Sequence, residues 1–238
     1  MESVVVVVVA ALALMLVEWL APGVRLPIIR GWWARALVIN LIQALVVYLG
    51  VFLWDGWLPG LARWHAESLG TIPAILLGYL SLTFVYYWWH RARHESAFLW
   101  RWLHQVHHSA SRLEVATSFY KHPFEMLINS ALSSFILHAL LGLSPANATL
   151  VITLAGVAEL LYHSNLRTPY WSGFIFQRPE SHRRHHELGH HRDNYSDLPL
   201  WDMLFGTFDN PRDRPRECGF GAGRERQLWR MLAGRHPR

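Results

Sequence analysis

Long apolar stretches alternate with arginine-rich polar segments along the chain. Five stretches of about 17–20 residues contain almost no charge: Val4–Leu20, Leu37–Trp54, Thr71–Trp89, Phe124–Leu143 and Ala146–Tyr162. A helix needs about 20 mainly apolar residues to cross a hydrocarbon core of ~30 Å. The pattern therefore predicts an all-α integral membrane protein with about four to five transmembrane helices.

Two features of this pattern leave alternatives open. The link Ser144–Ala146 is so short that the last two stretches can form a hairpin that does not fully cross. The first stretch has the length of a signal peptide, but Met1–Ser3 lacks a basic region and no small-x-small cleavage motif follows. We expect an uncleaved span there.

The basic residues predict the orientation in the membrane. If all five stretches cross, every one of the 22 Lys and Arg residues except Arg63 lies on one side. The positive-inside rule then places the N-terminus outside and the C-terminus, with most histidines, in the cytoplasm. The net charge of +5 suits anionic lipid headgroups. Because the arginines follow the loops between apolar stretches, no nucleic-acid partner is expected.

We expect a single membrane-embedded domain over residues 1–238, with N-terminal spans in 1–70, a catalytic core in 71–211 and a basic tail in 212–238. The tail sets Leu228 and Trp229 among arginines, which fits a segment on the membrane surface or a solvated terminus. Cys218 is the one cysteine, which excludes an internal disulfide and thiolate metal sites. Any metal must use histidine and carboxylate ligands.

Histidine spacing supplies the candidate chemistry. The segments HRARH, HQVHH and HRRHH contain His90 and His94, then His104, His107 and His108, then His182, His185 and His186. Positions i, i+3 and i+4 return to one face of a helix, so each triplet is expected to project three imidazoles in one direction. Imidazole is a common ligand for iron, zinc and copper. The alternative, a solvated or pH-sensitive basic surface, does not require this repeated spacing.

A ninth candidate is His163, at the end of the fifth apolar stretch, with Glu159 one helical turn before it. Eight or nine imidazoles exceed the four ligands of a closed structural zinc site. They suit two metals with about four ligands each and room for an exogenous group.

The order HxxxH, HxxHH, HxxHH, together with HSNLRTPYW, RPESHRRHH and NYSDLPLWDMLFGTF, resembles the fatty acid hydroxylase superfamily, also called the sterol desaturase family. The resemblance extends from about His90 to Pro211. Members are membrane-embedded, oxygen-dependent di-iron enzymes that hydroxylate, desaturate or otherwise oxidise C–H bonds of lipids. The resemblance thus implies two iron ions, which zinc can replace during purification, O2 as co-substrate, and a fatty acyl, sterol or isoprenoid substrate.

The resemblance also implies a set of site residues. The expected metal ligands are His90, His94, His104, His107, His108, His163, His182, His185 and His186. Residues expected next to the ligands or in the substrate cleft are His122, Glu125, Glu159, Asn165, His191, Asn194, Asp197 and Asp202. Some members place a histidine at the position of Glu159, so its carboxylate is expected either to bind metal or, as we favour, to orient an imidazole.

Three further histidines are expected to lie outside the ligand set. His190 and His191 follow Gly189, which is expected to end the helix and turn both away from the ligand face. His191 is then close enough to Asn194 to brace a ligand. His138, inside the fourth apolar stretch, is expected to be a hydrogen-bonded core histidine.

The reaction expected from the resemblance is hydroxylation of an unactivated lipid C–H bond. Desaturation on the same site is the closer alternative, and non-catalytic metal binding or transport is the other. A transporter is expected to place polar ligands near the middle of the membrane, whereas these histidines lie at one boundary. The segment GFGAG lacks the GxGxxG spacing and no CxxCH motif is present. A separate electron donor, whether ferredoxin, cytochrome or reductase, is therefore implied.

Overall fold

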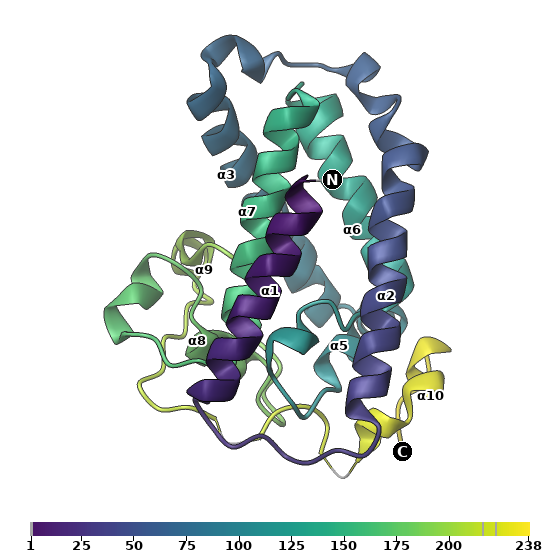
Figure 1. The fold of residues 1–238 in the computed structure, drawn as a ribbon, viewed down its shortest axis with the longest axis vertical. Helices are drawn as coiled ribbons and strands as arrows, with labels where there is room; N and C mark the ends of the chain where they lie inside the picture. Colours follow the sequence, from purple (N-terminus) through teal and green to yellow (C-terminus); the bar gives the residue numbers. More distant parts are fainter. Residues whose placement is uncertain (1, 216, 222) are drawn as a thin grey trace.

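The computed structural model describes residues 2–215, 217–221 and 223–238, and the regular elements in this part of the chain are helical. Long helices run roughly along the longest axis, and the short α-helices α5, α8, α9 and α10 lie in the lower half of Figure 1. The long helices are α1 (Glu2–Leu20), α2 (Trp32–Gly50), α3 (Thr71–Glu95), α6 (Pro123–Ser134) and α7 (Pro145–His163). The predicted all-α fold is confirmed.

Short elements connect and complete this bundle. The α-helical ones are α4 (Ala97–Leu99), α5 (Gln105–His108), α8 (Pro179–His185), α9 (Pro199–Phe205) and α10 (Leu228–Leu232). The 3-10 turns are η2 (Leu58–Leu61), η3 (Ala66–Leu69), η5 (Val115–Thr117), η7 (Tyr170–Phe174) and η8 (Arg224–Arg226). Three π-helical segments are η1 (Val51–Asp55), η4 (Trp100–His104) and η6 (Phe135–Leu140).

Proline fixes where several helices begin. Pro123, Pro145, Pro179 and Pro199 are the first residues of α6, α7, α8 and α9. Proline is favoured at this position because the missing N–H would have no partner within the helix, and its φ already suits the helix. Before α7, the Ser144 side chain also accepts a hydrogen bond from the backbone N–H of Asn147.

Three helical segments are long and apolar enough to cross a membrane: Trp32–Asp55, Thr71–Glu95 and Pro145–His163; Val4–Leu20 is a shorter apolar helix. The stretch Phe124–Leu143, which was expected to cross, instead forms α6 and η6 and is not among them. Its polar residues Glu125, Asn129 and His138 are buried in the protein. The structure therefore has three or four apolar helices of spanning length.

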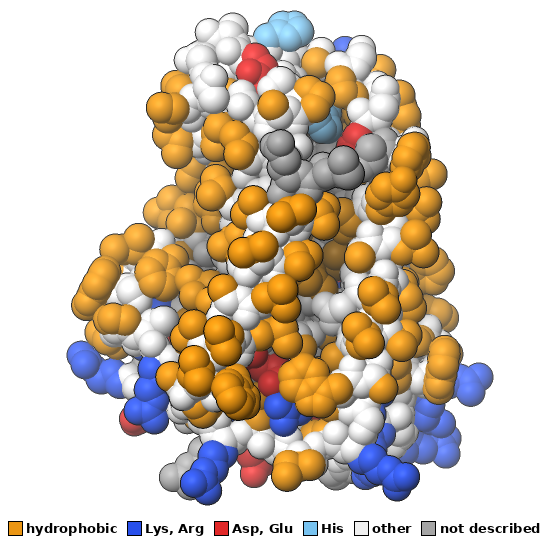
Figure 2. All heavy atoms as spheres, viewed as in Figure 1, with side chains coloured by type: hydrophobic (Ala, Val, Ile, Leu, Met, Phe, Trp, Pro, Cys, Tyr) orange, Lys and Arg blue, Asp and Glu red, His pale blue; other side chains and the backbone are white. Residues whose placement is uncertain are grey.

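The surface fits a protein embedded in lipid. Outward-facing residues of α1 and α2 remain exposed although they are large and apolar, for example Leu12 and Leu41. Figure 2 shows hydrophobic side chains over the upper and middle parts of this face and Lys and Arg side chains mainly at the lower end. An exposed apolar surface of this extent marks an interaction surface, here the bilayer.

The C-terminal segment is part of the packed core. Leu228 and Met231 of α10 join a buried cluster that includes Trp32 of α2 and Val106 of α5. Trp229, between them, is 82% exposed. Neither expectation for the tail, a membrane-surface segment or a solvated terminus, describes this docking of its apolar side onto α2 and α5.

Candidate metal centre

Nine buried or half-buried histidines form two adjacent clusters below the long helices. The five-histidine cluster comprises His90, His94, His104, His108 and His185; the four-histidine cluster comprises His107, His163, His182 and His186. Within each cluster the candidate ligand nitrogens lie within 4.8 Å of one another. All nine histidines that the sequence identified as candidate ligands thus fall into these two groups.

Each histidine triplet is divided between the two clusters. His104 and His108 belong to the five-histidine cluster, whereas His107 belongs to the other. The second triplet is divided in the opposite sense, because His182 and His186 join the four-histidine cluster and His185 joins the five-histidine cluster.

This division corrects the expectation that each triplet projects in one direction. Residues i and i+4 of a helix differ by about 40° around the axis, whereas residue i+3 lies about 100° from residue i+4. The middle histidine of HxxHH therefore reaches a second centre beside the one that the outer two share.

The Nε2 atoms converge inside the clusters. His185 and His90, and likewise His104 and His94, place their Nε2 atoms 3.1 Å apart. In the four-histidine cluster, the Nε2 atom of His163 lies 3.0 Å from that of His182. Two nitrogens bound at right angles to a metal, each about 2.1 Å from it, are about 3.0 Å apart. The spacing therefore fits imidazoles that share a metal ion.

Outer hydrogen bonds orient the rings of the five-histidine cluster. Nδ1–H of His90 donates to the carbonyl of Tyr195 at 2.7 Å, and that of His185 donates to the carbonyl of Asp193 at 2.6 Å. Nδ1–H of His94 donates to the His191 carbonyl at 2.8 Å. A carbonyl only accepts, so these bonds place the proton on Nδ1 and leave the Nε2 lone pair facing the cluster.

His108 and His104 use side-chain partners instead. Nδ1 of His108 lies 3.1 Å from Nδ1 of His191. Nδ1–H of His104 donates to Glu125 at 3.1 Å, and Arg93 forms a buried ion pair with the same carboxylate. Glu125 is fully buried, and Arg93 provides the positive charge that a carboxylate in this interior needs.

The four-histidine cluster is less firmly held from outside. Nδ1–H of His163 donates to the Glu159 carbonyl at 2.9 Å, and that of His107 donates to the Tyr120 carbonyl at 3.3 Å. Nδ1 of His182 and Nδ1 of His186 are buried and have no hydrogen-bond partner among the described residues.

Burial keeps these imidazoles neutral. Desolvation lowers the pKa of His107, His108, His182 and His186 well below 6.5, and neighbouring imidazoles lower it further. Burial lowers the pKa of His185 to about 3. A neutral imidazole keeps the lone pair that binds a metal, so these nitrogens can coordinate metal at neutral pH without first losing a proton.

Glu159 lies outside both clusters. Its carboxylate forms an ion pair with Lys121, which neutralises it, while its backbone carbonyl holds His163. Of the two roles expected for this residue, the geometry fits the one in which Glu159 orients an imidazole, although through its carbonyl and not its carboxylate.

Asp202 and Asn194 brace the turn that leads away from α8. Asp202 accepts hydrogen bonds from the backbone N–H groups of Tyr195 and Ser196, and the Tyr195 carbonyl in turn holds His90. The side chain of Asn194 binds the carbonyls of Ser181 and Asp209. Both residues therefore act on the clusters through the backbone.

Other candidate residues lie farther from the nitrogens. Asp197 accepts from the Tyr162 hydroxyl at 2.8 Å. Asn165 ties the chain after α1 to the end of α7 through Val24. His122 caps the N-terminus of α6: its Nδ1 accepts from the Phe124 N–H, and its Nε2 donates to the carbonyl of Leu232, so both ring nitrogens are used within the protein.

The helix that carries the last triplet ends earlier than expected. α8 ends at His185, before Gly189, and His186 enters its cluster from just beyond the helix. His190 lies outside the nine-histidine set. His191 contacts two members of the set, His94 through its carbonyl and His108 through its ring. His138 is buried and hydrogen-bonded to the Leu143 carbonyl, which confirms it as a core histidine.

Sequence reasoning missed several partners of the clusters. Trp100, in the π-helical segment η4, packs against the rings of His94 and His108, with centroids 5.1 Å apart in both cases. Arg93 was also missed, although its place between His90 and His94 was a usable signal. The carbonyl groups of Tyr120 and Asp193 give no signal in a sequence.

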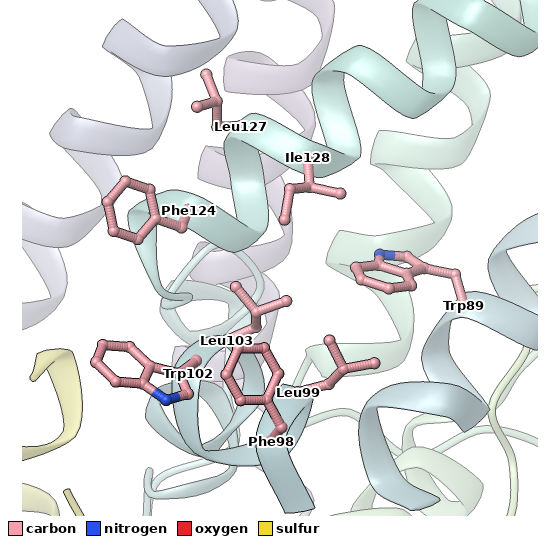
Figure 3. Close-up of a pocket in the computed structure, with 8 residues that line it drawn as sticks. All are labelled: Trp89, Phe98, Leu99, Trp102, Leu103, Phe124, Leu127 and Ile128. Carbon is pink, nitrogen blue, oxygen red and sulfur yellow. The ribbon is translucent and has the colours of Figure 1, made fainter. Parts of the chain in front are cut away.

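An apolar groove of about 340 Å³ has walls that include chain neighbours of the five-histidine cluster. Figure 3 shows its lining, which comes from α3, the segment from α4 to η4, and α6: Trp89, Phe98, Leu99, Trp102, Leu103, Phe124, Leu127 and Ile128. Trp89 and Leu103 directly precede His90 and His104, so the groove wall and the cluster share two short segments of chain.

Together, the fold and the clusters define a helical membrane protein with a site suited to two metal ions. A family model described as fatty acid hydroxylase matches residues 75–207, more than half of the 238 residues. The chain therefore belongs to the fatty acid hydroxylase family of di-iron oxidoreductases, which confirms the resemblance seen in the sequence.

Curated relatives include several lipid oxygenases. The chain is similar to an ornithine lipid hydroxylase of Rhizobium tropici (37% identical, covering 62% of this chain and 45% of the relative). It is also similar to a sphingolipid C4-hydroxylase of Schizosaccharomyces pombe (28%, covering 53% and 44%) and an alkylglycerol monooxygenase of Caenorhabditis elegans (26%, covering 71% and 33%). The chain spans less than half the length of these relatives. No solved structure matches it.

Proposed function

We propose that this protein is an O2-dependent hydroxylase that binds one iron ion in each histidine cluster and oxidises an unactivated C–H bond of a membrane lipid. The observation that carries the proposal is the convergence of nine imidazole nitrogens into two groups with metal-like spacing. Histidine-only ligation without thiolate suits iron, and zinc is the metal most able to replace it during purification.

The overall reaction consumes one O2, two electrons and two protons, and yields the hydroxylated lipid and one water. Bound iron supplies the reduction of O2 and the oxidation of the C–H bond. The protein supplies neutral imidazoles, the hydrogen bonds that fix their orientation, and a site from which bulk water is excluded. His107, His108 and His186, each at most 2% exposed, illustrate this exclusion.

The apolar groove supports a lipid substrate. Its walls are apolar, and Phe98 and Phe124 at its rim are mostly exposed on the surface assigned to the bilayer. An alkyl chain can pass from lipid into this groove without crossing water. The three relatives described above are named for an ornithine lipid, a sphingolipid and alkylglycerol, and others for very-long-chain aldehydes; from the first three we favour a polar membrane lipid as the substrate class.

The proposal includes a separate electron donor, such as a ferredoxin, a cytochrome or a reductase. It also places the N-terminus outside and the histidine clusters and C-terminus in the cytoplasm, because Lys and Arg gather at the end that holds the short helices. Electrons and protons would then reach the clusters from the cytoplasm, and the lipid from the bilayer.

Lipid mass spectrometry of cells with and without the protein tests the reaction. A lipid whose mass rises by about 16 Da, as one added oxygen requires, is expected with the wild type and not with a His107→Ala variant expressed at the same level. A product lighter by about 2 Da would assign desaturation instead. Unchanged lipids in cells whose purified protein holds metal would favour non-catalytic metal binding.

A further inference from the structure

A third group of possible metal ligands lies outside the two histidine clusters. His190, Asp193 and Asp209 place one candidate ligand atom each within 4.8 Å of one another. His190 and Asp193 belong to the turn after α8, and Asp209 follows α9. Gly189, with φ +80°, lets the chain turn back so that His190 faces Asp193.

The His190 side chain is only 10% exposed, and its Nε2 atom lies 3.1 Å from a carboxylate oxygen of Asp193. The contact lacks hydrogen-bond geometry, and Nε2 has no hydrogen-bond partner among the described residues. A buried imidazole nitrogen that faces carboxylates without a hydrogen bond is suited to coordinate a cation.

We propose that His190, Asp193 and Asp209 bind a third metal ion, a divalent cation such as Zn²⁺ that accepts both nitrogen and carboxylate ligands. Three protein ligands leave positions for water, as in open zinc sites. A nitrogen ligand disfavours Mg²⁺ and Ca²⁺, which prefer oxygen. Two carboxylates within this distance repel each other, and a cation between them removes that repulsion.

Arginines near the site provide part of this compensation already. Nε of Arg184 lies 3.1 Å from Asp209, and Nε of Arg192 lies 3.8 Å from Asp193. Both arginines are at least one-third exposed, so these pairs are weak. The carboxylate oxygens they leave free can still bind a cation, and a metal titration separates cation binding from a purely ionic network.

The third site would act on the five-histidine cluster through the backbone. Asp193 would bind the cation with its side chain while its carbonyl accepts from Nδ1–H of His185. His191, Asp193 and Asn194 have φ values of +44°, +64° and +50°, a left-handed conformation that is uncommon for residues other than glycine, although His, Asp and Asn adopt it more often than most. A cation at Asp193 would hold this turn in the conformation that orients His185. This consequence, unlike the site itself, rests on the proposed function.

Metal stoichiometry tests the site. Full-length protein in detergent, with its tightly bound metals loaded, is dialysed against increasing Zn²⁺ and analysed for total metal. The wild type is expected to bind one further equivalent, which His190→Ala and Asp209→Asn both lose. Asp213→Asn, which removes an exposed carboxylate a few residues away, is the matched control and should keep it. Mg²⁺ in place of Zn²⁺ should add no equivalent.

The outcomes separate this proposal from the proposed function. A wild type that binds no further equivalent, or variants that both retain it, would overturn the third site. Equal binding of Mg²⁺ would exclude His190 as a ligand. If the histidine clusters bind no metal, the protein contains none before the Zn²⁺ titration, and the proposed function fails. The equivalent of Zn²⁺ bound during the titration would still depend on His190. A misfolded variant is recognised because it loses the metals bound in the histidine clusters. If His190→Ala misfolds, His190→Gln is used in its place.

Discussion

The two histidine clusters differ in how firmly the protein holds them. All five imidazoles of the five-histidine cluster have a partner at Nδ1, whereas two of the four in the other cluster have none among the residues described. Outer partners of this kind fix ring orientation and raise metal affinity. The five-histidine cluster is therefore a preorganised centre, whereas no outer hydrogen bond fixes the orientation of two rings in the four-histidine cluster.

The difference follows from which elements surround each cluster. The turn from His191 to Tyr195 supplies three carbonyl groups to the five-histidine cluster, and buried Glu125 supplies a carboxylate. The four-histidine cluster instead draws its outer partners from the end of α7 and from the carbonyl of Tyr120. One centre is thus held mainly by a single turn and a buried carboxylate, and the other by the last turn of α7 and one loop carbonyl.

The largest expected effect comes from removing a single imidazole from either cluster. His185→Ala and His186→Ala should each lower activity by more than the ~10–100-fold typical of losing an outer partner, because each deletes a direct metal bond. Metal loss should be greater for His186→Ala, which leaves three imidazoles, than for His185→Ala, which leaves four. Elemental analysis of purified variants measures this, and equal losses would remove the distinction between the clusters.

A smaller effect is expected from the ring of His191, which contacts His108. His191→Ala should lower metal affinity of the five-histidine cluster by ~10–100-fold, since it removes an outer partner but no ligand. His190→Ala is the matched control in the same turn and should leave both histidine clusters loaded. If His190→Ala empties them as His186→Ala does, the ligand assignment for this turn is wrong.

Spacing in the sequence identified eight of the nine histidines, because imidazoles repeated at helical intervals beside apolar stretches are typical of a metal site. His163 was expected from its place at the end of the fifth apolar stretch. Spacing could not assign them to centres, since the division of each triplet depends on how α5 and α8 face each other. The family, the helical fold and a lipid oxygenase activity followed from the same residues. The ligand roles and the identity of the metals remain predictions.

What the sequence could not predict has a common physical origin. Backbone carbonyls such as those of Tyr195 and Asp193 are present in every residue, so their use as outer partners has no side-chain signal. The π-helical turn η4, which carries Trp100 and His104, follows from packing and not from a motif. The docking of α10 likewise depends on Trp32 and Val106, which are distant in the chain.

The order in which chelators remove metal would sharpen the comparison. In a triple variant, His90→Ala with His94→Ala and His185→Ala, the five-histidine cluster keeps only two imidazoles, so metal is expected in the four-histidine cluster alone. His107→Ala with His186→Ala likewise leaves two imidazoles in the four-histidine cluster, so metal is expected in the five-histidine cluster alone. We expect metal to leave the four-histidine cluster about 10-fold faster, because its free Nδ1 atoms leave two rings without an outer partner. Release into excess chelator is followed by elemental analysis. The reverse order would show that outer partners do not set the difference.

The smallest effect concerns one proton at His191, which lies beside the five-histidine cluster only. Burial lowers its pKa to about 4, below the ordinary value of 6.5. Between these values the unfolded chain holds a proton that the folded chain lacks, so folding stability is lost as the pH falls from 6.5 toward 4. For one group the loss is at most about 1.4 kcal/mol per pH unit.

In metal-free protein, His191→Gln should therefore flatten the fall in unfolding free energy across this window, as denaturant titrations at pH 7 and 5.5 can measure. A slope as steep as that of the wild type would mean that His191 is protonated in the folded protein, and hence that its contact with His108 is not the neutral brace described here.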